Sequence, residues 1–360
     1  MECLEDIFYN SKVLITGHTG FKGSWLSLWL HKLGAKVYGI SNKIPTNPSH
    51  FALASVPEII KDIRLDIKNY IPVKNAISEI KPDFIFHLAA QPIVRESFEN
   101  PLETWDANTI GTLNLLESLR QYSKNCIAIF ITSDKVYDNQ EWPWGYRESD
   151  KLGGPDPYSA SKGAAELAIS SYYRSYFKNK YDIRICSARA GNVIGGGDWA
   201  RDRIVPDCIR SWELGNSVLL RNPNSTRPWQ HVLEPLFGYL SLAAALRENI
   251  KINGESYNFG PQSEQNKKVI ELVNSLGSFF SSSKIRIEKN EEIKESNLLK
   301  LNCDKALNDI GWSPTLNYKQ TVQFTAYWYL NYFNSPKSIR QTSINQIEMF
   351  TDIFKKKLKL

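Results

Sequence analysis

The feature that most restricts the fold of this chain is a set of three glycines between an apolar run and a helical pattern. Gly17, Gly20 and Gly23 lie in KVLITGHTGFKGSWLSLWL, after a predicted strand over residues 12–16 and at the start of a predicted helix over residues 22–33. The first glycine permits a tight turn, the second lets the backbone approach a pyrophosphate, and the third lets helix and strand pack closely. Glycines at this spacing also occur in simple loops, but the flanking strand and helix predict a dinucleotide site at the helix N-terminus.

Strand and helix patterns continue to alternate as far as about residue 188, which is typical of a parallel sheet covered by helices on both faces. Predicted strands cover residues 12–16, 36–40, 59–63, 83–88, 127–132 and 183–188, and predicted crossover helices cover residues 22–33, 70–80, 104–122 and 158–177. The predicted fold class is therefore α/β, a Rossmann-type doubly wound parallel sheet with a smaller mixed α/β C-terminal lobe.

The regular alternation fades after Gly191, which sets the predicted domain organisation. Residues 1–190 are expected to form the dinucleotide-binding Rossmann domain. Residues 191–334 are expected to form a substrate lobe that is interleaved with the first domain, and residues 335–360 a C-terminal helix or tail.

Length and composition are compatible with an enzyme that needs neither disulfides nor metal. At 360 residues and 42% hydrophobic, the chain can bury a large core. The cysteines are odd in number, scattered and never in a C-x-x-C pair, which disfavours a disulfide framework or a zinc site and favours the cytoplasm. They are Cys3, Cys126, Cys186, Cys208 and Cys303. No pair of histidines, or of histidine and carboxylate, has metal-ligand spacing on one helix face, so we expect no metal.

Neither a membrane nor a nucleic acid is an expected partner. No apolar run approaches the roughly 18 residues of a membrane span, and the start MECLEDIFYNSK lacks the features of a signal peptide. The net charge of +6 is spread along the chain, and the one dense basic run, KKKLKL at the end, is best interpreted as a solvated tail.

A tyrosine and a lysine are placed for proton transfer. Tyr158 and Lys162 are four residues apart in PDPYSASK, so their side chains project from one face of a predicted helix. A neighbouring ammonium and a positive nicotinamide ring both favour phenolate and lower the pKa of a tyrosine from its usual value of about 10. The Y-x-x-x-K spacing is common by chance, but its position between the fifth and sixth predicted strands favours a catalytic role. Ser133 follows the strand CIAIFIT, at the sheet edge where open α/β folds bind ligands.

These motifs, in this order, resemble the extended short-chain dehydrogenase/reductase family. The G-x-x-G-x-x-G spacing, the set of Ser133, Tyr158 and Lys162, and the segments RLDI and HLAAQP all match its pattern. The resemblance implies that Asp66 meets the adenine, that the HLAAQP loop lines the cofactor, and that an asparagine in the following helix is structural. The implied cofactor-binding residues are Gly17, Gly20, Phe21, Gly23, Ser41, Asp66, Ile67, Leu88, Ala89, Ala90, Gln91, Asn108, Tyr158 and Lys162.

The choice between NAD and NADP is not decided by the second strand itself. An acidic residue at the end of that strand would mark NAD by binding the ribose 2′-hydroxyl. The segment VYGISNKIP instead offers Ser41, Asn42 and Lys43, which leaves NADP open. The family resemblance implies NAD.

Asp134 and Lys135 narrow the resemblance to one branch. In the sugar-nucleotide 4,6-dehydratases this turn carries an acid and a base, usually Asp and then Glu, whereas TSDKVYDN resembles the CDP-glucose 4,6-dehydratase branch. The same branch is echoed by GFKGSWLSLWL, HLAAQPIVRES, YRESDKLGGPDPYSASK, RAGNVIGGGDW and RNPNSTRPWQHVLEPL, over roughly residues 12–260. Without this resemblance, the Asp134 and Lys135 side chains would be interpreted as solvent-exposed residues of an ordinary turn.

The resemblance implies NAD-dependent dehydration of CDP-glucose. Tyr158 would act as base during oxidation at C4, and Asp134 as acid and Lys135 near the C5 proton during loss of water across C5–C6. Hydride return to C6 would complete the reaction. The alternatives are another nucleotide-sugar 4,6-dehydratase or a 4-epimerase and, from a different class, a non-catalytic dinucleotide sensor on the same fold, which would be expected to lose Tyr158 or Lys162.

The substrate diphosphate calls for cationic, preferably bidentate, groups in the second lobe. Arg203, Arg221 and Arg227 are candidates there, although a surface ion pair explains any single arginine equally well. Arg227 with His231 in RPWQH resembles diphosphate and ribose contacts of the family, and Asn192 in AGNVIGG resembles a bridge to the substrate phosphate. The resemblance also implies a homo-oligomer, a dimer or tetramer, formed through the predicted helices over residues 104–122 and 158–177.

Overall fold

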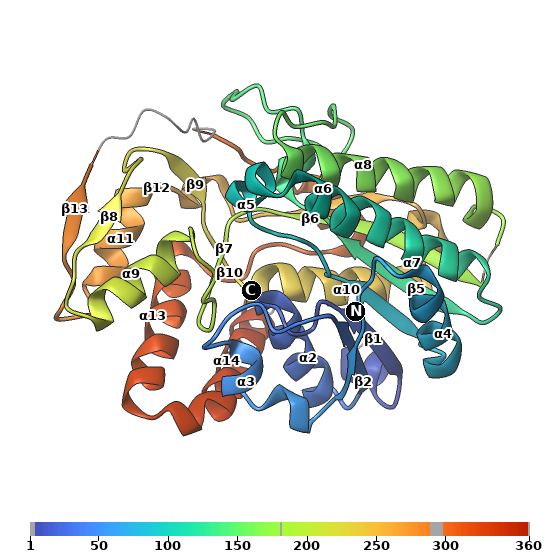
Figure 1. Cartoon of the computed structure of the whole chain (residues 1–360), viewed down its shortest axis with the longest axis horizontal. Helices are drawn as coiled ribbons and strands as arrows, with labels where there is room; N and C mark the ends of the chain where they lie inside the picture. The colour runs from blue at the N-terminus through green and yellow to red at the C-terminus, as the bar shows by residue number, and fades with distance from the viewer. Residues whose placement is uncertain (1–3, 181, 289–297, 359–360) are drawn as a thin grey trace.

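The central element of the computed structural model is a seven-stranded sheet in the order β11-β6-β5-β4-β1-β2-β3 (Figure 1). The structure describes residues 4–180, 182–288 and 298–358. All neighbouring strands of the sheet run parallel. The strands are β1 (Lys12–Thr16), β2 (Lys36–Ser41), β3 (Lys61–Arg64), β4 (Phe84–His87), β5 (Cys126–Ile131), β6 (Ile183–Ala190) and β11 (Ser256–Phe259). The predicted Rossmann-type sheet is confirmed, and its first six strands were predicted to within two residues at each end.

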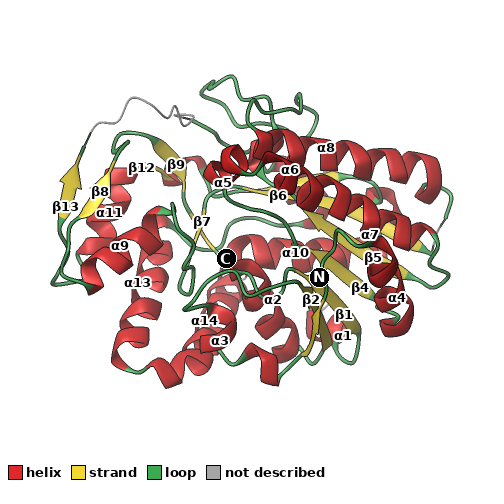
Figure 2. Ribbon diagram, in the orientation of Figure 1, coloured by secondary structure: helices red, strands yellow, loops and turns green. Residues whose placement is uncertain are grey.

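Two helical layers cover the sheet, as Figure 2 shows. On one face, α4 (Tyr70–Ile80), α7 (Gly111–Arg120) and α8 (Pro157–Tyr172) bury Val73, Leu116 and Ile169 in one core. On the other face, α2 (Phe21–Lys32) and α10 (Leu233–Glu248) share a second, larger core with the opposite side of the strands. The central strands β1, β4 and β5 are apolar and buried on both faces, which explains why a helical layer forms on each side of the sheet.

Two helices that were predicted as continuous each contain a π-helical turn. The predicted helix over residues 104–122 consists of α6 (Pro101–Trp105), the π-turn η2 (Asp106–Ile110) and α7. The predicted helix over residues 158–177 consists of α8 and the π-turn η4 (Tyr173–Phe177). A π-turn inserts one residue without breaking the helical pattern, so periodicity alone does not reveal it.

The edge strand β11 comes from beyond residue 190, in the part of the chain predicted to form the second lobe. It pairs with β6, from Ser256 opposite Ser187 to Phe259 opposite Ala190. Much of the rest of that lobe lies to the left in Figure 1, with α9 (Ile204–Glu213), α11 (Val269–Gly277) and short strand pairs, whereas α10 of the same predicted lobe lies against the central sheet. Those strands are β7 (Val193–Ile194) with β10 (Gln230–His231), β8 (Val218–Leu220) with β13 (Ile285–Ile287), and β9 (Thr226–Pro228) with β12 (Asn266–Lys268). The exact domain boundaries stay a prediction.

The remaining α-helices are distributed along the described part of the chain. They are α1 (Leu4–Phe8), α3 (His50–Leu53), α5 (Val94–Glu99), α12 (Asp304–Ile310), α13 (Tyr318–Asn334) and α14 (Ile339–Leu358). α14 accounts for most of the segment predicted as a helix or tail. It packs against α2, where Lys32 forms an ion pair with Glu348 and the fully buried Phe350 meets the ring of Trp29 edge-on at 5.7 Å. Residues 359–360 of the basic run lie outside the described residues.

The four cysteines in the described part of the chain are free thiols, and Cys3 lies outside it. Within the same residues, no group of three or more His, Cys, Asp or Glu side chains is arranged to hold a metal ion. Nor does any described helix combine the length and the apolar character that crossing a membrane requires.

Because Phe350 fills a site between Trp29 and Phe237, we expect Phe350→Ala to lower the free energy of unfolding by about 3–5 kcal/mol. The neighbouring Met349 is 52% exposed, and Met349→Ala should change the same quantity by less than about 0.5 kcal/mol. Urea unfolding of both variants measures the difference. Equal, small effects would mean that α14 is not part of the core.

Candidate active site

The candidate site lies at the carboxyl edge of the sheet, where the strand order reverses between β1 and β4. Ligands of open α/β sheets bind at such a switch point because the loops that follow the two strands diverge there. The loops after β1, β4 and β5 carry the glycines, the segment from Leu88 to Gln91, and the turn with Ser133. The fold therefore gathers residues from three separate parts of the sequence at one edge.

The glycine loop has the close backbone approach that a dinucleotide needs. Gly17 has φ +74°, and a Cβ there would stand 2.7 Å from the backbone nitrogen of Ala89. A Cβ on Gly23 would stand 2.2 Å from the carbonyl oxygen of Gly17, so α2 meets β1 with no room for a side chain. Phe21 begins α2 directly after its N-cap Gly20, which leaves the first amides of the helix facing the loop. This cradle fits the pyrophosphate of a dinucleotide.

Polar side chains surround this cradle. The Ser41 hydroxyl shares a hydrogen bond with that of Thr19 at 2.7 Å, and Asn42 donates to the Asp66 carboxylate at 3.2 Å. Ser41 and Ile67 are buried, while Leu88, Ala89 and Ala90 are half-buried. The structure thus brings together, at the ends of β1 to β4, the expected cofactor residues that precede Asn108 in the chain.

Asn108 connects the cofactor loop to helix α8. From the π-turn η2 it accepts a hydrogen bond from the Gln91 amide at 2.8 Å and donates to the Gln91 carbonyl oxygen at 3.2 Å and to the Ser161 hydroxyl at 3.0 Å. The geometry matches the structural role expected for this asparagine.

A short helical turn, η3 (Asp134–Val136), carries the expected acid–base residues. Ser133 caps it, since its hydroxyl accepts from the Lys135 amide at 3.2 Å and donates to the Asp134 carboxylate at 3.0 Å. Asp134 is buried and the Lys135 side chain is half-buried. Opposite this turn, Tyr158 lies in the first turn of α8, where Asp156 caps the helix. Lys162 lies one turn further and donates to the Ile131 carbonyl oxygen at 3.4 Å.

Burial changes the acidity of these groups. It raises the pKa of the Asp134 carboxyl, against the opposing charge of Lys135 and the hydrogen bond from Ser133, so Asp134 is suited to donate a proton. Burial lowers the pKa of Lys162 to about 8, against the charge of Glu166.

The expected lowering of the Tyr158 pKa is not found in the chain alone. Burial raises that pKa to about 12, because it outweighs the hydrogen bond of Ser133 and the charge of Arg203. Lys162 is not among the groups that act most strongly on the phenol. Further positive charge in the site is therefore needed to make Tyr158 a base.

The expected substrate residues divide into two groups. Arg203 forms an ion pair with Asp198 at 2.9 Å, and its charge acts on Tyr158, while the charge of Arg227 acts on Asp134. Asn192 lies just before β7, and its carbonyl oxygen accepts from the Gln230 amide at 3.1 Å. The two arginines thus act on the acid–base groups, and Asn192 lies between β6 and β7.

The other two do not reach the acid–base groups. Arg221 is exposed after β8, and its charge acts on Asp207 of α9. His231 is fully buried, with its ring 5.5 Å from that of Phe324 and 6.3 Å from that of Trp25, and burial lowers its pKa to about 3. Its expected contact with the substrate stays a prediction.

The structure adds two residues that the sequence analysis did not single out. The Lys22 amine lies 3.5 Å from the Tyr239 hydroxyl, and burial lowers its pKa to about 7, with the charges of Arg203 and Asp134 next in strength. A Cβ on Gly191 would stand 2.7 Å from the Asp134 carboxylate. Both residues stand in motifs already noted, GFKG and RAGNV, but only the fold brings them beside Asp134.

Comparison with known proteins places the chain in a family. A sequence model described as GDP-mannose 4,6 dehydratase matches residues 14–325. The chain belongs to the GDP-mannose 4,6 dehydratase family. Within this dehydratase family, the chain is 43% identical to a CDP-glucose 4,6-dehydratase of Salmonella typhimurium, over 90% of this chain and 92% of that protein. The predicted resemblance to the extended short-chain dehydrogenase/reductase family is confirmed.

Solved structures agree with the fold of this dehydratase family member. The epimerase Mth375 of Methanothermobacter thermautotrophicus matches with a TM-score of 0.78 and 22% identity, over 93% of this chain and 96% of that chain. The UDP-glucuronic acid 4-epimerase of Bacillus cereus, solved in complex with UDP-glucuronic acid and NAD, matches with a TM-score of 0.75 and 22% identity, over 89% of this chain and 99% of that chain. At these identities the likeness establishes the fold.

We expect Gly17→Ala to weaken dinucleotide binding and lower the melting temperature more than Gly215→Ala does. Both glycines have a left-handed backbone, with φ +74° and +70°, so each alanine costs about 1–2 kcal/mol for conformation alone. Only at Gly17 does the new methyl group collide with backbone, since nothing lies within 4 Å at Gly215. Thermal unfolding and a fluorescence titration with NAD measure the two effects. Equal losses of NAD affinity and of melting temperature in the two variants would contradict a role for the close approach of Gly17 to Ala89 in dinucleotide binding.

Proposed function

We propose that this protein dehydrates CDP-glucose to CDP-4-keto-6-deoxy-glucose and water. The observation that carries the proposal is the position of Asp134 and Lys135 on one turn with Ser133, at the sheet edge where Tyr158 begins α8. Oxidation and elimination each need their own proton transfers, and this edge offers a separate set of groups for each. The nucleotide is proposed from the likeness to the Salmonella typhimurium CDP-glucose 4,6-dehydratase.

NAD is the proposed cofactor. The glycine cradle, Ser41, Asp66 and the loop from Leu88 to Gln91 would hold it, and Lys162 would bind its ribose hydroxyls. The NAD in the Bacillus cereus epimerase structure supports this choice. When bound, NAD would accept the hydride from C4 of the sugar and return it to C6, so that no net oxidation results.

Tyr158 is the proposed base for the 4-hydroxyl of the sugar. Burial holds the phenol protonated in the chain alone, so the base forms only when positive charge is added beside it. Loss of the 4-hydroxyl proton accompanies the departure of hydride from C4 and yields a 4-keto sugar. The carbonyl group makes the C5 proton acidic.

Asp134 and Lys135 then carry the elimination. Asp134, whose pKa is raised by burial, gives its proton to the departing 6-hydroxyl, which leaves as water. Lys135 lies next to it in the turn and either takes the C5 proton itself or acts as a fixed cation. As a cation it would polarise the 4-keto oxygen or position a water molecule, and the water would then take the C5 proton. A proton must return to C5 when hydride arrives at C6, which balances the reaction as loss of one water.

Cationic side chains of the second lobe are proposed to bind the diphosphate. Arg203 and Arg227 act on the catalytic groups and offer the planar donors that suit phosphate oxygens, and Asn192 is proposed to bridge to the same group. Arg221 is proposed for the same group, although its side chain is exposed after β8 and its charge acts on Asp207 of α9.

Two rival functions use the same fold. A 4-epimerase needs Ser133, Tyr158 and Lys162 but has no use for the acid and cation of the neighbouring turn. A non-catalytic dinucleotide sensor needs none of these side chains, and their burial together in one site disfavours it. The product of the reaction distinguishes all three.

Self-association in the cytoplasm is also proposed. Helices α5, α6 and α8, with the π-turns η2 and η4, expose large apolar side chains, and such a surface favours contact with another protein. They are Phe98, Leu102, Trp105, Ile110, Leu167 and Tyr176. A second copy of the chain, as dimer or tetramer, is the proposed partner, and the free thiols support a reducing compartment.

Incubation with CDP-glucose, UDP-glucose and dTDP-glucose tests the function. We expect a 4-keto-6-deoxy sugar from CDP-glucose in clear preference to the other two, measured by mass spectrometry of the products and by the base-induced absorbance of the keto sugar. Preference for another nucleotide would overturn the substrate. Inversion at C4 without loss of water would overturn dehydration.

Lys135→Ala should separate elimination from oxidation. In this variant Tyr158 is intact, so the nicotinamide absorbance should still change on addition of CDP-glucose, while product forms slowly or not at all. In heavy water the wild type should incorporate deuterium at C5, and the variant far more slowly. Tyr158→Phe is the comparison, because it removes only the hydroxyl that starts oxidation and should abolish the absorbance change. If Lys135→Ala abolished it as completely, Lys135 would belong to the oxidation step or to substrate positioning.

A further inference from the structure

A buried ion pair beneath the site joins a carboxylate on α8 to a guanidinium on β6. Arg189 donates to both carboxylate oxygens of Glu166, from Nε at 3.0 Å and from Nη2 at 2.9 Å. Their side chains are 3% and 2% exposed, respectively. Burial would raise the pKa of Glu166, but the charge and hydrogen bonds of Arg189 hold it below its usual value, so the pair is ionic.

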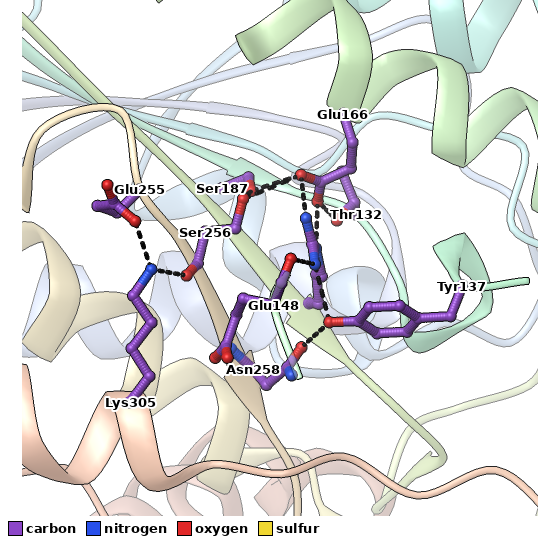
Figure 3. Close-up of polar contacts among 10 residues, drawn as sticks. Thr132, Tyr137, Glu148, Glu166, Ser187, Glu255, Ser256, Asn258 and Lys305 are labelled. Atoms are coloured by element: carbon purple, nitrogen blue, oxygen red, sulfur yellow. Dashed lines mark hydrogen bonds and ion pairs between the residues drawn. The ribbon is translucent and has the colours of Figure 1, made fainter. Parts of the chain in front are cut away.

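This pair holds the acid–base turn at both ends, as Figure 3 illustrates with Thr132 and Tyr137. Before the turn, the Thr132 hydroxyl donates to Glu166 at 2.5 Å. After the turn, the Tyr137 hydroxyl accepts from Arg189 Nη1 at 2.8 Å and donates to Asn258 of β11 at 2.8 Å. Ser133, Asp134, Lys135 and Val136 are the residues between these two anchors. Among the described residues, this is the one ion pair that forms side-chain hydrogen bonds to residues on both sides of the turn.

The same pair is also tied to the oxidation residues. Tyr158, Lys162 and Glu166 follow one another at four-residue intervals on α8, so they lie along one face of the helix. Through Glu166, the position of the turn is therefore set relative to Tyr158 and Lys162. Through Arg189, it is set relative to β6, the strand that leads to Gly191 and Asn192.

We infer that Glu166 and Arg189 are positioning residues, which hold the turn of Asp134 and Lys135 in register with Tyr158 and Lys162 so that elimination follows oxidation in one site. This inference rests on the proposed function. A buried ion pair is weak evidence for stability, because desolvation offsets much of its attraction. Five directed hydrogen bonds on one carboxylate, by contrast, define a geometry: two come from Arg189 and one each from Thr132, Ser187 and Ser256. A shift of about 1 Å in a reacting group can lower a rate by about 100-fold.

The test uses Thr132→Val, which removes only the hydroxyl that anchors the turn to Glu166. Ser187→Ala is the matched control, because Ser187 also donates to Glu166, at 2.8 Å, but from β6 and not from the turn (Figure 3). We expect Thr132→Val to lower kcat by about 10- to 100-fold with little change in the KM for CDP-glucose. Ser187→Ala should keep kcat within about twofold, and Thr132→Ser, which restores a hydroxyl, should recover most of the rate.

The deciding readout is the partition between oxidation and elimination. Quenching with borodeuteride traps any 4-keto sugar, and mass spectrometry gives the fraction that still holds its 6-hydroxyl. That fraction should rise in Thr132→Val and stay at the wild-type level in Ser187→Ala, whereas a general loss of stability would leave it unchanged in both. Equal fractions in the two variants would overturn the inference.

Failure of the proposed function has a different signature, since the wild type itself would then form no 6-deoxy product. If Thr132→Val does not fold, Tyr137→Phe replaces it, because that variant releases the other end of the turn. The trapped fraction should rise in the same way. An unchanged fraction in Tyr137→Phe would also overturn the inference.

Discussion

The contact on which the rest of the site depends is the close packing of α2 on the end of β1. A Cβ on Gly23 would lie 2.2 Å from the Gly17 carbonyl oxygen, and one on Gly17 would lie 2.7 Å from the backbone of Ala89. With no side chains in the way, the helix N-terminus reaches the point where the strand order reverses. The loop after β4 then lies against the glycine loop, and the two loops together form the proposed cofactor cradle.

The electrostatics of the site follow from burial of a mixed set of charges. Lys22, Asp134, Lys162 and Arg203 lie close enough for their charges to act on one another or on Tyr158. Desolvation raises the pKa of the acid and lowers the pKa values of the two amines, which brings proton donors and acceptors nearer to neutral pH. Groups with such pKa values suit a reaction in which protons are taken from the substrate and returned to it within one site.

Beneath these groups, the ion pair of Glu166 and Arg189 joins the helix of Tyr158 to the turn of Asp134. The cost of burying both charges is offset by hydrogen bonds from Thr132 and Ser187, and by the Tyr137 hydroxyl. This connection bears on the proposed function, because a dehydratase differs from an epimerase in needing the turn as well as the helix. The likeness to a CDP-glucose 4,6-dehydratase alone does not explain how the two parts keep their spacing.

The sequence by itself determined the parallel sheet, its first six strands, the glycine loop and the pair Tyr158 and Lys162, because these depend on local periodicity and on fixed spacing along the chain. Tertiary structure alone decided what depends on contacts between distant segments. The edge strand β11 pairs with a strand some seventy residues earlier, as the register of Ser256 with Ser187 shows. Lys22 and Gly191 come to Asp134 from opposite ends of the Rossmann pattern, and His231, expected at the substrate, is enclosed by Trp25 and Phe324. Burial raises the pKa of Tyr158 in the chain alone, whereas the sequence analysis expected an ammonium and a nicotinamide ring to lower it. Desolvation is a property of the packed site and not of the spacing of residues along the chain.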